Sequence, residues 1–274
     1  MVQGKVNAAL KLLNNSNGSG VLPLSPETIK DLQEKHPNSS PIDESMLIEG
    51  ELPFVDPEIF NNIDEDKIYR AALKTKEACG PSGLDADGWR RILASKHFGT
   101  VGSDFRSTLA SFARTFCRRE VEIIMLSDSK QYSNIEAYTA CRLIRLDKNP
   151  GVRPIGVGEV LRRIVGKSIM SVIKPEVVES AGSLQLCAGQ PAGCEAAVHA
   201  LTKIFGEEET DGLLLVDASN AFNSLNRKVL LHNIKYICPP MATYIRNCYV
   251  IPSRLFVTGG LEIKSAEGTT QAIL

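Results

Sequence analysis

The chain has 274 residues, 43% of them hydrophobic, and a formal net charge of −1, as in many globular proteins. This length suffices for one large domain or two small ones. The near-zero net charge excludes a globally basic nucleic-acid-binding protein, but the charges are unevenly distributed. Residues 1–88 contain 8 Lys/Arg and 15 Asp/Glu, whereas residues 142–174 contain 8 Lys/Arg and 2 Asp/Glu. The segment 142–174 is therefore predicted to offer a local basic patch to a polyanion.

Cysteine usage and hydropathy restrict the cellular setting. The seven cysteines include no C-x-x-C pair, and the four histidines are not spaced as metal ligands. An odd number of cysteines argues against a disulfide framework, so a reducing compartment is expected. No apolar run approaches the roughly 18 residues of a membrane span, and no secretory signal begins the chain. We expect an intracellular protein, cytoplasmic or nuclear, that is neither secreted nor membrane-spanning.

The N-terminal region is predicted to be helical and partly irregular. A short helix at 6–13 precedes a polar linker, and a second helix at 26–36 is capped by Ser25. Four prolines make the acidic stretch 37–62 irregular. A further helix is expected at 64–75, because its apolar residues share one face.

A rigid turn and a long helix come next. Gly80 to Asp85 contains Pro and two Gly, and a helix is expected from about Asp87. Residues 104–126 are predicted to form an amphipathic helix capped by Ser103. Its apolar face would carry Phe105, Leu109, Phe112 and Phe116.

Residues 142–157 are predicted to form a β-hairpin, because two apolar runs flank an Asn-Pro-Gly turn. Lys148 lies near the tip and Arg153 on the returning strand. A lysine point charge beside an arginine fork suits a phosphate group. The alternative is an ordinary surface hairpin with solubilising charges.

Two helices follow the hairpin in the prediction. The first, at 159–174, is expected to end at Pro175, and the second spans about 191–205. The first helix turns its apolar residues inward and presents basic residues on its polar side. If the 142–174 segment binds nucleic acid, the contact residues would be Arg162, Arg163 and Lys167.

Four apolar residues at 213–216 run directly into Asp217, a pattern typical of a strand buried on both faces. A carboxylate at the end of such a strand is costly unless a cation meets it. Asp217 is therefore either the cap of the next helix or a ligand for a metal ion.

The C-terminal part of the chain is predicted to contain two helices and a hairpin. Asn226 caps a helix that ends near Cys238, and a short helix covers 241–249. Strands at 254–258 and 261–265 flank a Gly-Gly pair, which is a hairpin signal.

The ordered set of these segments resembles the reverse transcriptases of non-LTR retrotransposons. Gly80 to Asp85 is similar to the GPDG element before the fingers, and 146–155 to the fingers hairpin. Gln185 to Gly193 resembles the Q-x-G-F-R segment, 216–222 the first catalytic palm element, and 267–271 the start of the next. The similarity covers about residues 79–271.

The resemblance implies an RNA-directed DNA polymerase, a nucleotidyltransferase that uses Mg²⁺, a deoxynucleoside triphosphate and an RNA or DNA template-primer. Asp217 would be the catalytic, metal-binding aspartate, and the Ala218 carbonyl a second metal ligand. The implied nucleotide-binding residues are Lys148 and Arg153 for the triphosphate, Phe222 against the ribose 2′ position, and Gln271 beside the incoming nucleotide.

The sequence departs from the family at the catalytic centre. No [YF]-x-D-D tetrapeptide occurs, and Ala272-Ile273-Leu274 stands where Gly-Asp-Pro is usual. A two-metal mechanism clamps the reacting oxygens between ions about 4 Å apart, which one aspartate cannot hold. We therefore expect a truncated protein with impaired Mg²⁺ binding and no polymerase activity on its own.

The expected fold class is α+β, with right-hand polymerase fingers and an incomplete palm. The expected regions are an N-terminal acidic region at 1–78, a fingers-like region at 79–190 and a partial palm at 191–274. Two alternatives stay open: a non-catalytic nucleic-acid-binding module that uses the basic 142–174 segment, and a non-functional gene remnant that aggregates through exposed apolar surface.

Overall fold

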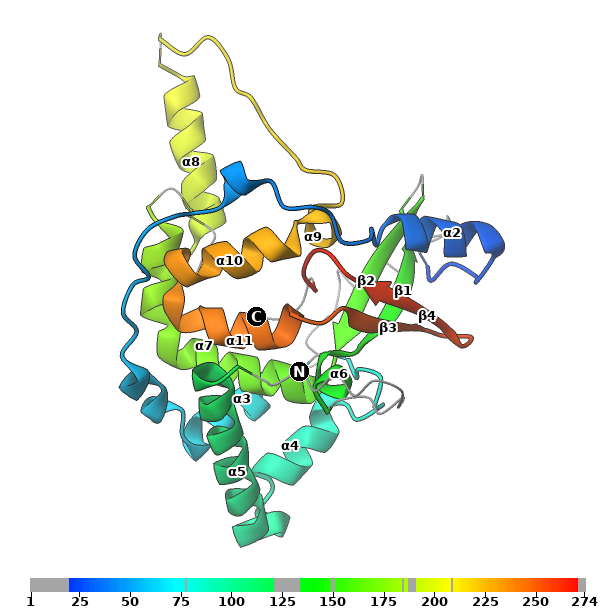
Figure 1. Cartoon of the computed structure of the whole chain (residues 1–274), viewed down its shortest axis with the longest axis vertical. Helices are drawn as coiled ribbons and strands as arrows, with labels where there is room; N and C mark the ends of the chain where they lie inside the picture. The colour runs from blue at the N-terminus through cyan, green and yellow to red at the C-terminus, as the bar shows by residue number, and fades with distance from the viewer. Residues whose placement is uncertain are drawn as a thin grey trace, which may run out of the picture.

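The chain folds as an α+β protein in which helices pack beside one four-stranded mixed sheet (Figure 1). The computed structural model describes residues 20–76, 78–120, 134–148, 151–183, 185–186, 191–207 and 209–270. The predicted helix at 6–13 lies outside these residues, as do residues 187–190 and Gln271.

The described helices follow the predicted order closely. They are α2 (Pro26–Glu34), α3 (Glu65–Lys74), α4 (Ala86–Ala94), α5 (Gly99–Arg118), α6 (Asn134–Thr139), α7 (Val160–Ala181), α8 (Gly193–Phe205), α9 (Ala221–Ser224), α10 (Arg227–Ile237) and α11 (Pro239–Tyr249). Short 3₁₀ helices are η1 (Glu44–Met46), η2 (Pro57–Asn62) and η3 (Lys96–Phe98).

Side-chain caps explain where several helices begin. The Ser25 hydroxyl accepts a hydrogen bond from the Thr28 N–H at 3.1 Å, as the sequence predicted. The Asn226 side chain accepts one from the Val229 N–H at 3.1 Å and confirms the predicted start of α10. Each contact satisfies a backbone donor that the first helical turn leaves without a partner.

The sheet has the order β2-β1-β3-β4. Its strands are β1 (Cys141–Asp147), β2 (Val152–Gly158), β3 (Ser253–Val257) and β4 (Leu261–Ser265). Both predicted hairpins form, β1 with β2 and β3 with β4, and β1 pairs with β3 in parallel. Pro154 lies on β2, at an edge of the sheet, where its missing N–H costs no ladder hydrogen bond.

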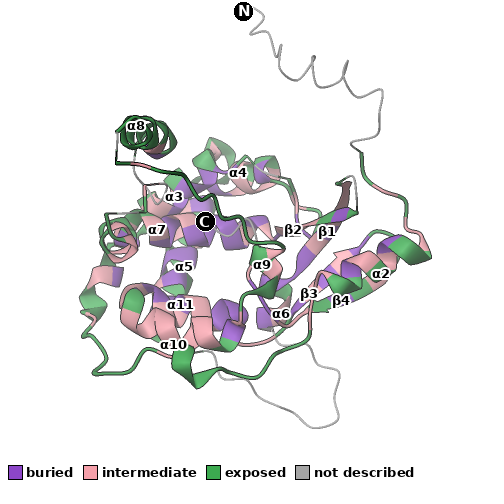
Figure 2. Ribbon diagram, turned by 90° about the horizontal axis from the view of Figure 1, so that it is seen from above, coloured by how far each residue is buried: buried purple, intermediate pink, exposed green. Residues whose placement is uncertain are grey.

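Helix α7 lies at the centre of the helical part, and two apolar clusters share it. Val160 and Ile164 pack with α3, α4 and α5, whereas Val165, Ile169 and Ile173 pack with η2, α5 and α11. A third cluster joins one face of the sheet to Leu32 of α2. Figure 2 shows these buried positions in purple. The clusters mix residues of all three predicted regions.

Besides the end of the predicted 104–126 helix, which lies at Arg118, two predicted helix limits are wrong. Helix α7 continues through Pro175 to Ala181, because Ile173 before the proline and Val177 after it pack against the same core. Helix α5 begins at Gly99, so Ser103 is not its cap and instead donates to a Glu65 carboxylate oxygen at 2.7 Å. Tertiary packing outweighs the local start and stop signals in both cases.

The predicted buried strand at 213–217 is also wrong. This stretch has no regular secondary structure, and its apolar side chains are exposed: Leu214 is 86% and Val216 is 85% accessible. Figure 1 shows the chain leaving α8 and returning to α9 as an extended connection away from the sheet. A strand requires a hydrogen-bonded neighbour, and none of the described strands pairs with this stretch.

None of the described helices combines the length and the apolar character that a membrane crossing requires. The cysteines in the described part of the chain are free thiols. Burial raises the pKa of the Cys117 thiol to about 12, so this cysteine is a neutral core residue.

Candidate functional site

The glycine-rich turn before α4 contacts the start of α7. A Cβ atom on Gly80 would lie 2.8 Å from the Glu159 Cα and the Gly158 carbonyl oxygen, so only glycine fits there. The Ser82 N–H and hydroxyl each donate to a Glu159 carboxylate oxygen at 2.7 Å. Segments that lie far apart in the sequence are therefore joined at the point where β2 ends.

The β1–β2 hairpin carries its two predicted phosphate ligands at the surface. Lys148 and Arg153 are both exposed, and the Lys148 N–H donates to the Gly151 carbonyl at 3.0 Å across the turn. Arg153 is paired in register with Leu146. The hairpin therefore presents two cations to solvent near its tip.

The short helix α9, which follows the Asp217 segment, packs against the stretch after β4. The Gly268 N–H donates to the Leu225 carbonyl at 2.8 Å, and the Thr269 N–H donates to the Phe222 carbonyl at 2.6 Å. Phe222 itself is 53% accessible. Two of the segments that carry the resemblance are thus in direct contact.

Buried charges hold this contact in place. The Glu267 carboxylate is 3% exposed and accepts from the Ser40 and Arg227 N–H groups, both at 2.6 Å. The Arg227 guanidinium donates to the carbonyls of Ser265 at 2.7 Å and Gly268 at 3.0 Å. Because every one of these groups is hydrogen-bonded, the buried pair fixes the backbone of 265–268 against α10.

A small cavity lies where the sheet, α9 and the 265–270 stretch meet. Its volume is about 20 Å³, and most of its lining is polar. The lining residues are His36, Leu143, Pro154, Gly156, Asn223, Leu255, Ser265, Thr269 and Thr270. Such a volume holds about one water molecule, so a nucleotide enters only if α9 or the hairpin moves.

The cavity joins the hairpin to the segment before Gln271. A Cβ atom on Gly156 would lie 3.2 Å from the Thr270 Cγ2 atom, so β2 and this segment are in contact. The Thr270 N–H also donates to the Tyr249 hydroxyl oxygen at 3.1 Å. Burial lowers the pKa of His36, whose Nδ1 lies 2.7 Å from the Leu32 carbonyl oxygen, so its ring is neutral at pH 7.

Arg153 points away from this cavity. Residues paired in register share one face of a sheet, and successive residues alternate between faces. Pro154 and Gly156 line the cavity, so Arg153 lies on the opposite face together with Leu146. The sheet therefore separates the predicted triphosphate ligand from the cavity that Asn223 and Thr270 line.

The predicted metal ligands are not assembled. Asp217 and Ala218 are exposed and lie in the stretch without regular structure. Among the described residues, no group of three or more His, Cys, Asp or Glu side chains is placed to hold a metal ion. Gln271, the fourth predicted nucleotide-binding residue, lies outside the described part of the chain.

The basic residues predicted on the polar face of α7 are buried or half-buried. Arg162 is 1% and Arg163 is 5% exposed, so neither side chain can reach a nucleic-acid backbone. Arg162 stacks on the Tyr249 ring at 5.3 Å, and Arg163 donates to the Ala78 and Gly158 carbonyls. Lys167 is half-buried, and its Nζ lies 3.4 Å from the Thr75 hydroxyl. These cations join elements of the fold, which corrects the prediction.

Sequence reasoning missed the residues that organise the site. Arg227 was not singled out, and Glu267 entered only as the first residue of the 267–271 segment, yet both are buried. Tyr249 lies between two guanidinium groups, each 5.3 Å from its ring centroid, those of Arg162 and Arg227. Local periodicity gave no signal, because the three residues meet only through tertiary packing.

No protein-family model matches the sequence, and no curated protein matches it.

Proposed function

We propose that this chain is a reverse-transcriptase-like protein that binds nucleic acid through its fingers-like hairpin and has no polymerase activity on its own. In this proposal Lys148 and Arg153 contact phosphates of the template-primer or of a deoxynucleoside triphosphate. The polymerase resemblance supplies the substrate class, and the surface position of both cations is compatible with it.

One observation carries the proposal. Parts of four resembling segments, at 80–85, 146–155, 216–222 and 267–271, are distant in sequence, yet they meet beside the sheet. The glycine-rich turn contacts the end of β2 through Ser82 and Glu159. The stretch before Gln271 contacts β2 through Thr270 and α9 through Gly268. These contacts are compatible with the proposal.

The same geometry supports the absence of catalysis. Two-metal phosphoryl transfer requires carboxylates that are fixed around both ions. Asp217 is exposed on a stretch without regular structure, and the sequence contains no Asp-Asp pair. In this proposal the chain binds nucleic acid but does not catalyse nucleotide addition.

Primer extension tests the catalytic half of the proposal. Purified protein, Mg²⁺, a primed RNA template and all four deoxynucleoside triphosphates are incubated beside an active polymerase. We expect no extension by this chain, because one exposed carboxylate cannot position two metal ions. Robust incorporation would contradict the proposal.

Fluorescence anisotropy with a labelled template-primer tests the binding half. Replacement of both hairpin cations (Lys148→Gln with Arg153→Gln) is expected to weaken binding about tenfold and to reduce the salt dependence by about two counterions. Lys30→Gln is the matched control, because Lys30 is an exposed cation on α2. Equal affinity of the double variant and the control would remove the hairpin from the binding surface.

A further inference from the structure

An open groove of about 430 Å³ lies between the end of α3 and one face of α4, away from the sheet. It is lined by Leu73, Asp87, Arg90, Arg91, Ala94 and Ser95. The lining residues of α4 recur at i, i+3, i+4 and i+7, so they form one face of the helix. The volume lies within the range of sites for small organic ligands.

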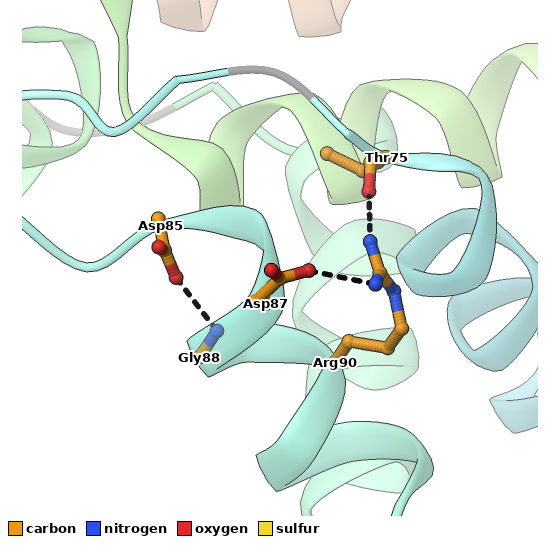
Figure 3. Close-up of polar contacts among 5 residues, drawn as sticks. All are labelled: Thr75, Asp85, Asp87, Gly88 and Arg90. Atoms are coloured by element: carbon orange, nitrogen blue, oxygen red, sulfur yellow. Dashed lines mark hydrogen bonds and ion pairs between the residues drawn. The ribbon is translucent and has the colours of Figure 1, made fainter. Parts of the chain in front are cut away.

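Arg90 is held in a fixed position in this groove (Figure 3). Its Nη1 lies 2.7 Å from the Asp87 Oδ1 atom, and its Nη2 donates to the Thr75 carbonyl at 2.9 Å. The guanidinium thus bridges α4 to the chain just after α3. Asp85 accepts from the Gly88 N–H at 2.8 Å and caps the helix that carries the arginine. A cationic fork fixed in advance loses little conformational freedom when it binds an anion.

The groove has an excess of positive charge. Among the described residues of its lining, Asp87 is the only carboxylate, and it is engaged by Arg90. Arg91 adds a second, exposed guanidinium. Lys74 follows Leu73 in the chain and Lys96 follows Ser95, and both lysines are exposed. The N-terminal region is acidic in composition, so its sequence does not indicate a basic surface. The basic residues come together only because folding brings the end of α3 beside α4.

We propose that the groove binds a phosphate-bearing ligand. Guanidinium groups recognise phosphate by paired hydrogen bonds, and the exposed Arg91 presents such a group. Arg90 adds a positive charge beside it, because its Nη atoms contact Asp87 and the Thr75 carbonyl and its Nε is buried. Leu73, which is 41% accessible, and Ala94 supply apolar surface for the organic part of a phosphate ester. The phosphate belongs either to a free phosphorylated small molecule or to a nucleic-acid backbone, and both present the same group to the arginines.

The single tryptophan of the chain makes the proposal directly testable. Trp89 precedes Arg90 on α4 and stacks on Phe105 with ring centroids 6.2 Å apart. Its fluorescence therefore reports on the surroundings of Trp89 on α4. The titrations use adenosine 5′-monophosphate, pyrophosphate, adenosine and single-stranded oligouridylate. The protein carries Lys148→Gln and Arg153→Gln, so that binding at the hairpin does not interfere. Calorimetry confirms each fluorescence change.

We expect adenosine 5′-monophosphate and pyrophosphate to bind and adenosine not to bind. Replacement of Arg91 and Lys74 by Gln is expected to weaken phosphate binding about tenfold, because an exposed guanidinium of the lining and an exposed cation next to Leu73 are lost. Lys228→Gln is the control, because Lys228 is an exposed cation on α10. Arg90 is left unchanged, since its removal also breaks the bridge to Thr75.

The outcomes separate the two sources of phosphate. If the Arg91 and Lys74 variants lose oligouridylate as well, and pyrophosphate competes with it, the source is a nucleic acid. If they lose only the small phosphates, the source is a free phosphorylated molecule. The proposal is overturned if adenosine binds as well as its monophosphate, if the variants bind like the control, or if no phosphate compound binds at about 1 mM. None of these results depends on polymerase activity.

Discussion

Gly268 shows how closely the chain is packed around the sheet cavity. Its φ is +69°, and a Cβ atom there would lie 2.1 Å from the Phe222 carbonyl oxygen and 2.4 Å from the Asn223 Cα. No side chain fits in that space, and a side chain also disfavours the positive φ. The absence of a side chain is thus what allows the 265–270 stretch to lie directly on α9.

Replacement of Gly268 by Ala is expected to reduce the free energy of unfolding by about 3 kcal/mol, because backbone strain and a steric clash add. Gly182→Ala is a matched control: its φ is +74°, but apart from its chain neighbours no described residue has an atom within 4 Å of the added Cβ. The control is expected to lose about 1 kcal/mol from strain alone. Urea unfolding measures both changes, and equal losses would show that α9 does not pack on Gly268.

His36, which lines the cavity, makes the stability of the fold depend on pH. Burial lowers the pKa of this histidine from its ordinary value of about 6.5, so the unfolded chain takes up the proton first as the pH falls. The residue therefore has no effect on stability well above pH 6.5, and it destabilises the fold progressively below that value. His36→Asn retains a side-chain donor but does not titrate.

The expected result is a smaller loss of stability between pH 7.5 and pH 5.5 in His36→Asn than in the native chain. Chemical unfolding at both pH values measures the difference, and comparison at pH 7.5 separates the loss of packing from the loss of titration. An identical pH dependence in the two proteins would exclude His36 as the titrating group.

Single residues differ in how far the sequence reveals their role. Ser25 and Asn226 were predictable as caps, because a cap depends only on the next three residues. Arg162 was not, since its helix places it toward Tyr249 and the start of β1, which come from distant parts of the chain. A charge at one position in the sequence carries no information about which elements will cover it.

At the scale of elements, the hairpins and the 213–217 stretch show opposite outcomes. The β3–β4 hairpin was predictable, because its two strands and its Gly-Gly turn are contiguous and each strand supplies the partner of the other. The run at 213–216 has an equally apolar sequence, but its partner would have to come from elsewhere. Apolar character predicts burial only where a neighbour exists to bury it.

The exposed run has a testable consequence. Replacement of Leu214 and Val216 by Ser is expected to change the free energy of unfolding by less than about 0.5 kcal/mol, because both side chains are already exposed. The same change should slow aggregation, as measured by light scattering at elevated protein concentration.

Leu143→Ser is the comparison, because Leu143 is 2% exposed on the cavity face of the sheet. It is expected to lose about 3 kcal/mol. If the Leu214 and Val216 variant is destabilised to a similar extent, the run is buried in solution and the exposed arrangement is wrong.

At the scale of the whole molecule, the distribution of charge in the fold differs from that in the sequence. The 142–174 segment is basic, but Arg162 and Arg163 are internal and Arg145 donates to the Leu22 carbonyl at 2.5 Å. The acidic N-terminal region, by contrast, places the exposed Lys74 next to Leu73, which lines the groove beside α4. The sequence located the charges correctly along the chain, but only the tertiary arrangement decides which of them solvent or a ligand can meet.

Helix α7 supplies a wall to each of the two large apolar clusters. If one cluster loses its packing, residues such as Ile164 lose their contacts and α7 is destabilised. Ile169 in the other cluster belongs to the same helix, so its packing is weakened as well. We therefore expect the two clusters of the helical part to unfold together. An evolutionary change that loosened either side would have to be accommodated by both.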